Sequence, residues 1–157
     1  MNEKLYLKDV KEKLQIIEQI DDQRILTEIA INDDDMQVQD EAVEKIDDEH
    51  LLYKIITSND KLWDPVLITA IRKITNEDYL VNIARKYRGD NIAKIAIQQI
   101  QDPIKLCEFT SFETGGCTFS DVVKRIVQSQ NPLAIQKLKN NIQEVYTYMY
   151  LKDHNLI

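Results

Sequence analysis

Apolar residues recur along this chain with a period of about 26 positions, and polar residues separate them. Isoleucines that we call anchors, Ile20, Ile46, Ile74, Ile100 and Ile126, are 26, 28, 26 and 26 positions apart. Self-similarity at a period between about 20 and 50 residues is typical of stacked repeats. We therefore expect about four similar units stacked in one domain.

Further apolar positions keep a nearly constant distance from the anchors. A leucine lies six positions after each of the first four anchors, a large apolar residue lies nine positions after them, and an apolar pair follows. Spacings of three and four place such residues on one face of an α-helix. Helices of about three turns are unstable alone in water, so each unit is expected to be a helix pair that buries its apolar faces against its neighbours. These positions are Leu26, Leu52, Leu80 and Leu106, then Ile29, Ile55, Ile83 and Phe109, and the pairs Ala42/Val43, Ala70/Ile71, Ala96/Ile97 and Val122/Val123.

Aspartates mark where the helices of the first unit begin. Asp21 or Asp22 is a plausible N-cap for the first helix, and Asp34 or Asp35 for the second. Their carboxylates can accept hydrogen bonds from the unpaired backbone N–H groups at a helix start.

Proline and glycine mark the connections in later units. Asp64 followed by Pro65 predicts an N-cap and the first helical position of a second helix. Gly89 is suited to a left-handed helix terminus, and Asp90 to the next N-cap. The fourth unit opens at Asp102 with a proline after it, and its connection, TSFETGGCTFSD, contains two glycines that interrupt the helical pattern.

The repeats span residues 20–126, and the flanking segments are expected to cap them. Residues 1–19 predict a helix that is the second half of an incomplete unit. Residues 127–157 predict a helix from about Pro132 and a final helix at the C-terminal end. One side of that last helix would carry Val145, Tyr146, Met149 and Tyr150.

The composition favours a helical protein, and two missing sequence signals bear on its expected cellular location. The 157 residues include only 3 Gly and 3 Pro, which leaves little room for long loops. The sequence contains neither the apolar core of a signal peptide nor about 18 consecutive apolar residues, so we expect a cytoplasmic protein without a membrane partner.

The net charge of −7 is unevenly distributed. Residues 1–50 carry 16 acidic and 6 basic side chains, a balance of −10, whereas residues 51–157 carry 11 and 14, a balance of +3. Nucleic-acid affinity rests largely on cationic contacts, so the acidic part makes a nucleic-acid partner unlikely along the whole molecule. A protein or peptide partner suits this distribution better.

The unit resembles the HEAT-like repeats of bacterial α-solenoid proteins. This resemblance implies an all-α, right-handed solenoid of about four short helix pairs with capping helices. It also implies a non-enzymatic scaffold that binds a protein or peptide on the concave wall formed by the second helices. The leucine-rich variant repeat is a related possibility. The residues that carry the resemblance are Leu26, Ile29, Ala30, Val38, Ala42, Val43 and Ile46.

Helical geometry predicts which side chains the second helices present to a partner. If the apolar pairs face the core, the opposite sides of the second helices form a wall. From the first unit to the last, the side chains of this wall change from acidic, through two isoleucines, to basic. Such a wall could orient a peptide by charge, although a merely solvated face is the simpler interpretation. Leu62 and Trp63, in the lengthened second-unit turn, are together a separate candidate contact, and packing of Trp63 over the ends of its own helices is the alternative interpretation. The predicted partner-binding residues are Glu18, Asp40, Glu44, Trp63, Ile68, Arg72, Lys94, Ile95, Gln98 and Lys124.

Three alternatives of other classes remain open at this point. A nucleic-acid-acting protein of the DNA glycosylase type would use basic residues of the wall. A cofactor-handling protein of the phycobilin lyase type would bind a chromophore, and a small acidic immunity or inhibitor protein would neutralise a basic toxin. The residues that favour nucleic acid are Arg72, Lys73, Lys94, Lys124 and Arg125.

Signals for catalysis, a metal or a cofactor are weak, so none of the three is expected. The aspartates of residues 33–35 lack the alternating ligand spacing of a calcium loop. Cys107 and Cys117 lack partners for a zinc site and are expected to be a buried thiol and a loop thiol. His50 and His154 are not evidently placed to activate Cys117.

Overall fold

The computed structural model describes residues 9–58, 62–110, 116–141, 149 and 151–153, and all regular structure within these residues is helical. The elements are α1 (Val10–Glu18), α2 (Gln23–Asn32), α3 (Met36–Glu44), α4 (Glu49–Ser58), α5 (Asp64–Arg72), α6 (Glu77–Lys86), α7 (Asn91–Gln99), α8 (Pro103–Leu106), the 3₁₀ helix η1 (Cys107–Phe109), α9 (Gly116–Gln128) and α10 (Pro132–Asn140).

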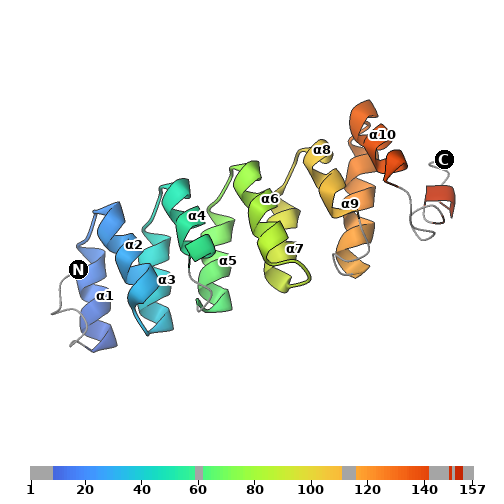
Figure 1. The fold of residues 1–157 in the computed structure, drawn as a ribbon. Coiled ribbons are helices and arrows are strands. Elements are labelled where there is room, and N and C mark those ends of the chain that lie inside the picture. Colours follow the sequence, from blue (N-terminus) through green and yellow to red (C-terminus); the bar gives the residue numbers. More distant parts are fainter. Residues whose placement is uncertain (1–8, 59–61, 111–115, 142–148, 150, 154–157) are drawn as a thin grey trace.

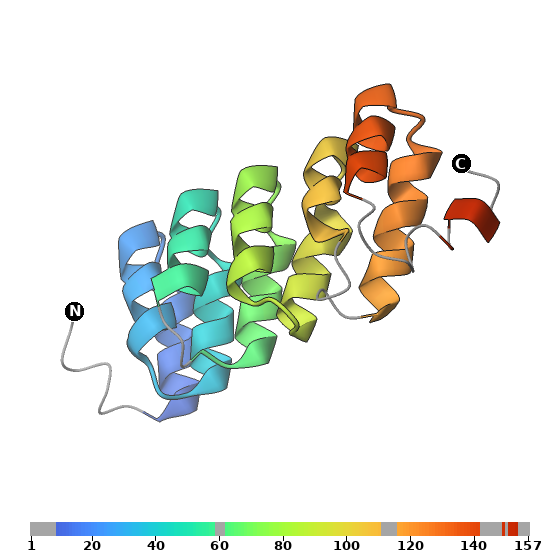
Figure 2. The same cartoon turned by 45° about the vertical axis from the view of Figure 1, so that its right-hand side comes forward.

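The helices form two layers, and successive helix pairs stand side by side in a row (Figure 1). In one layer α1 packs against α3, α3 against α5, and α5 against α7; we call these helices and the following α9 the odd-helix layer. In the other layer α2 packs against α4, and α4 against α6. Figure 2 shows the same two layers from a second direction. The second helix of each predicted pair therefore belongs to the odd-helix layer.

The core lies between the layers and consists of the residues that define the repeat. Ala42 and Val43 are fully buried, as are the anchors Ile46 and Ile100. Burial of each valine or isoleucine side chain contributes about 1.5–3 kcal/mol, and this contribution compensates for the weak stability of short helices. The predicted apolar face of the first unit is confirmed for Leu26, Ile29, Ala30, Val38, Ala42, Val43 and Ile46, which are all buried. The same face was expected to include Ile25, which is instead 45% exposed.

Most predicted helix starts are confirmed. The side chain of Asp22 accepts hydrogen bonds from the first turn of α2, and that of Asp35 does the same for α3. Asp102 caps α8, and Gly89 has a φ of 86°, in the left-handed region. Asp90 occupies the N-cap of α7, although its side chain makes no capping hydrogen bond.

Three predictions about the connections need correction. Trp63, not Asp64, is the N-cap of α5, so Asp64 is the first helical residue, where its negative charge suits the helix dipole. The predicted interruption over residues 110–121 is wrong in its second half, because α9 begins at Gly116. Cys117 therefore lies in the first turn of a helix and not in a loop.

The structure describes the predicted capping segments in part, and Met149, which was expected on one side of the last helix, is 53% exposed. α1 packs onto α3, as expected for the second half of an incomplete unit, and α10 begins at Pro132 behind its N-cap, Asn131. The first part of the predicted helix 3–19 and residues Val145, Tyr146 and Tyr150 lie outside the described residues.

Long polar side chains join each helix pair to the previous one. Lys45 Nζ donates to the carbonyls of Ile17 and Glu18 at 2.9 and 2.8 Å, at the C-terminal end of α1. In the next units Lys73, Gln99 and Arg125 make equivalent hydrogen bonds to the ends of α3, α5 and α7. Each donor directly precedes an anchor isoleucine. One of the carbonyls that each donor reaches also accepts a backbone N–H bond, as Ile17 does from Ile20, so the side chain adds a second hydrogen bond there. We call these four residues the C-terminal donors.

A second set of side chains joins the starts of the helices in the other layer. Gln23 accepts a hydrogen bond from the N–H of Asp47 at 2.8 Å, and Glu77 from that of Gln101 at 2.8 Å. In the unit between these two, Glu49 accepts hydrogen bonds from the N–H groups of Thr75 and Asn76 at 3.1 and 2.9 Å. Each acceptor is three positions after an anchor, so every junction of this type uses the same repeat position.

None of the helices in the described part of the chain combines the length and apolar character that spanning a bilayer requires.

Candidate functional site

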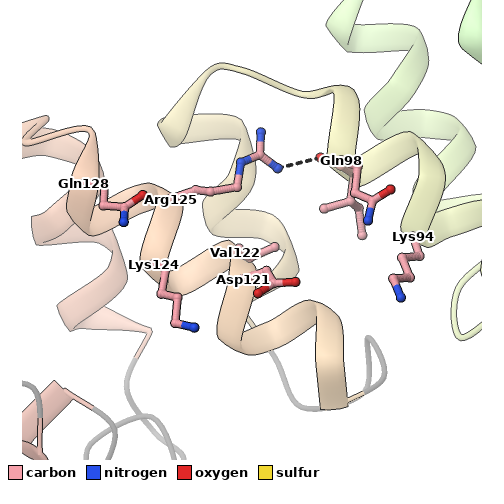
Figure 3. Close-up of a pocket in the computed structure, with 8 residues that line it drawn as sticks. Lys94, Gln98, Asp121, Val122, Lys124, Arg125 and Gln128 are labelled. Carbon is pink, nitrogen blue, oxygen red and sulfur yellow. Dashed lines mark hydrogen bonds between the residues drawn. The ribbon is translucent and has the colours of Figure 1, made fainter.

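A pocket of about 320 Å³ opens between α7 and α9, at the basic end of the odd-helix layer. Figure 3 shows side chains entering it from both helices. A volume near 300 Å³ is at the lower end of the range for small-ligand sites, and it is large enough for one amino-acid side chain. Its lining residues are Lys94, Ile97 and Gln98 from α7, with Asp121, Val122, Lys124, Arg125 and Gln128 from α9.

The pocket arises because the regular packing of the layer is relaxed at this junction. α9 packs mainly against α8, η1 and α10, and its backbone approaches α7 less closely than α5 does. The first helix of this unit is only the four-residue α8, continued by η1, so the pair cannot repeat the geometry of its predecessors. Side chains on the facing sides of α7 and α9 therefore remain accessible.

The charge of the pocket is positive. Three basic side chains and one acidic side chain, Asp121, line it, which gives a local balance of +2. Lys94 is half-buried on α7, and Lys124 is exposed on α9. Within the described part of the chain, neither ammonium group makes a hydrogen bond or ion pair. Both lysines are therefore available to an anionic ligand.

Arg125 has a structural role in the same pocket. Its guanidinium donates to the carbonyl of Ile97 at 3.0 Å and to that of Ile100, so it holds the end of α7 against α9 (Figure 3). Burial lowers the pKa of Arg125, and the carboxylates of Asp121 and Glu77 oppose that shift. A guanidinium nevertheless stays protonated at neutral pH, because arginine is not deprotonated in proteins.

Ile97 and Val122 provide the apolar side of the pocket. Both are core residues, buried beneath the charged groups. Gln98 and Gln128 are exposed and add amide groups that can donate or accept hydrogen bonds. The site therefore offers cations, amides and an apolar surface to one small ligand.

The structure brings together three of the predicted partner-binding residues, Lys94, Gln98 and Lys124, in this pocket. Glu18 and Glu44 are exposed at the ends of α1 and α3, at the acidic end of the layer. The exposed Arg72 occupies the matching position on α5. At the predicted wall positions, the charge is therefore acidic at Glu18 and Glu44 and basic at Arg72, Lys94 and Lys124, whereas α1 as a whole also carries the exposed Lys11 and α5 the exposed Asp64.

Four predicted wall residues are less accessible than the helical geometry suggested, and Lys94, half-buried in the pocket, is one of them. Ile68 and Ile95 are half-buried and pack against the core. Asp40 is also half-buried, and its Oδ1 is inaccessible and has no hydrogen-bond partner among the described residues. The reason is that inner helices of the layer have a neighbour on each side, which narrows the face that remains exposed.

Trp63 is accessible, as its role as a candidate contact requires. Its side chain is 54% exposed, whereas the preceding Leu62 is buried. The proposed pairing of both residues as one exposed contact is therefore wrong for Leu62. Trp63 is the N-cap of α5 and is not among the residues that line the α7–α9 pocket.

Cys107, Asp33 and His50, which were considered for catalysis or metal binding, have structural partners, whereas the Cys117 side chain and His154 lie outside the described part of the chain. Burial raises the pKa of the Cys107 thiol, which keeps it protonated and unreactive. Asp33 pairs with Lys13 at 2.8 Å, and His50 lies 3.3 Å from the hydroxyl of Tyr79. The described residues contain no group of three or more His, Cys, Asp or Glu side chains placed to hold a metal ion.

Comparison with family models, with curated proteins and with solved structures finds no match for this chain. The assignment of the site therefore rests on its own residues.

Proposed function

We propose that this chain is a right-handed HEAT-like α-solenoid that acts as a non-catalytic scaffold and binds a protein or peptide along its odd-helix layer. The two-layered row of helix pairs supports the architecture. The change from acidic to basic side chains along the layer supports the binding function, and it is the observation on which the proposal mainly rests. A partner with the opposite order of charges would bind in one orientation only.

The proposal is tested by affinity capture from a lysate of the cells that express the protein, at low and at moderate salt. The bait variant Arg72→Glu/Lys94→Glu reverses two charges of the odd-helix layer. Its matched control, Arg24→Glu/Lys54→Glu, makes the same change at exposed positions on α2 and α4. We expect one protein to be captured by the wild type and the control, and to be lost with the first variant.

Two results would contradict the proposal. Capture that is equal for all three baits would exclude the odd-helix layer as the binding surface. Retention of nucleic acid or of a coloured small molecule in place of a protein would favour the nucleic-acid or chromophore alternatives.

A further inference from the structure

Two lysines face the α7–α9 pocket from different helices, and the remaining cation there is engaged by the backbone. Lys94 and Lys124 make no hydrogen bond or ion pair with the described residues, whereas Arg125 donates to two carbonyls at the end of α7. In Figure 3, Asp121 lies between the two lysines. Asp121 forms an ion pair with neither lysine within the described part of the chain, so each ammonium group remains available to an external anion.

We propose that the α7–α9 pocket is an anchor site for the carboxylate of a single acidic side chain, presented by a peptide segment of the partner. This inference rests on the proposed function, because the pocket forms the basic end of the same layer. Ile97 and Val122, which are 2% and 1% exposed, lie at the base of the pocket, and the amides of Gln98 and Gln128 can hydrogen-bond the peptide around the carboxylate.

A polyanionic partner fits this surface less well than a peptide. Asp121 lies inside the pocket, and the layer becomes acidic toward Glu44 on α3 and Glu18 on α1. A phosphate backbone gains affinity from many cationic contacts in succession, and this layer does not supply them. A peptide can place an acidic residue in the pocket and basic residues farther along.

Chemical-shift titration of the ¹⁵N-labelled full chain measures the pocket alone. The probe is the blocked dipeptide N-acetyl-leucyl-glutamic acid amide, and its neutral isostere, with glutamine in place of glutamate, is the comparison. We expect saturable shifts of α7 and α9 amides with a dissociation constant on the order of 1–10 mM, which corresponds to the few kcal/mol that one small group can contribute. The glutamine dipeptide should bind at least about fivefold more weakly, because it lacks the charge-assisted contacts.

A charge-matched pair of variants locates the binding. Lys94→Gln/Lys124→Gln should weaken binding of the glutamate dipeptide roughly tenfold, since it removes both free cations. Lys11→Gln/Lys54→Gln removes the same charge from exposed positions on α1 and α4 and should leave the affinity unchanged. Thermal unfolding of both variants checks that neither change disturbs the fold.

Three results would overturn the inference: equal affinity for the glutamate and glutamine dipeptides, shifts that lie outside α7 and α9, or an affinity for inorganic phosphate that equals that for glutamate. Phosphate binding of that strength would identify a general anion site. The titration uses no cellular partner, so its failure is distinguishable from a failed capture experiment.

Discussion

Lys13 and Asp33 form an ion pair that is buried between α1 and the C-terminal end of α2. Lys13 Nζ donates to both carboxylate oxygens at 3.0 and 2.8 Å, and the two side chains are 10% and 2% exposed. Asp33 also accepts from the N–H of Asp35 at 3.0 Å, which fixes the turn into α3. A buried pair of this kind ties the capping helix to the first complete unit.

Replacing Lys13 by methionine is expected to destabilise the protein by about 3 kcal/mol, because the change leaves Asp33 charged, buried and without its counter-ion. Urea unfolding followed by circular dichroism measures the loss. The double variant Lys13→Met/Asp33→Asn should recover part of it, since the second change removes the unpaired charge. A loss below about 0.5 kcal/mol, the usual range for surface substitutions, would contradict this role for the pair.

Glu49 makes stability depend on pH. Hydrogen bonds from the Thr75 side chain, and then from the Asn76 and Thr75 N–H groups, lower the pKa of Glu49, while burial opposes the shift. A depressed folded-state pKa contributes stability that is present above the unfolded-state value, about 4.3, and is lost as pH falls through the folded-state value.

The variant Glu49→Gln should therefore lose less stability than the wild type on acidification from pH 6 to pH 3, as measured by urea unfolding at each pH. Glutamine keeps an acceptor oxygen, and Gln23 already occupies the equivalent position in the first unit. Parallel losses in the two proteins would show that Glu49 does not contribute to the pH dependence.

At the scale of the helices, the C-terminal donors connect consecutive units in the odd-helix layer. Lysine, glutamine and arginine all serve at this position, because each has a long side chain with N–H donors that reaches carbonyls at the end of the previous helix. A cation at this location also interacts favourably with the helix dipole.

Adjacent residues on α5 allow a controlled test of this arrangement. Lys73 donates to the carbonyls of Val43 and Glu44, whereas the neighbouring Arg72 is exposed. We expect Lys73→Met to reduce the free energy of unfolding by about 1–2 kcal/mol, since carbonyls at the end of α3 lose a charged donor. Arg72→Met should change it by less than about 0.5 kcal/mol. Equal effects of the two substitutions would show that the donor position does not stabilise the junction.

The apolar pattern predicted the helix pairs well, because burial selects the same residue types at the same spacing in every unit. The C-terminal donors were not predicted, although Lys45, Lys73, Gln99 and Arg125 directly precede anchor isoleucines in the sequence. The recurrence of these donors before each anchor could be detected in the sequence. Their acceptor carbonyls belong to the previous unit, so the hydrogen bonds could not be predicted without knowing how the units stack. The Lys13–Asp33 pair carries no periodic signal, since it occurs at one junction only.

The candidate site was partly predictable for a similar reason. Lys94, Gln98 and Lys124 were correctly placed on the second helices, and their meeting in one pocket depends on the wider separation of α7 and α9. That separation follows from the short α8 and η1, which the spacing of apolar residues did not predict. The structural role of Arg125 also requires knowledge of where α7 ends.

At the scale of the whole molecule, the described helices contact mainly their neighbours in the row. Such arrays gain stability from nearest-neighbour interfaces, so a loosely packed junction can open before the rest. We expect amide hydrogen exchange to be faster in α8, α9 and α10 than in α3, α4 and α5. Uniform exchange through one global opening would contradict this expectation.

The most direct measurement of the central claim is amide hydrogen exchange of the chain in complex with the partner obtained by affinity capture. The proposed binding mode predicts additional protection in α5, α7 and α9, including the amides around Lys94 and Lys124, with little change in α4 and α6. Additional protection confined to α2, α4 and α6 would contradict it, because the partner would then bind the opposite layer.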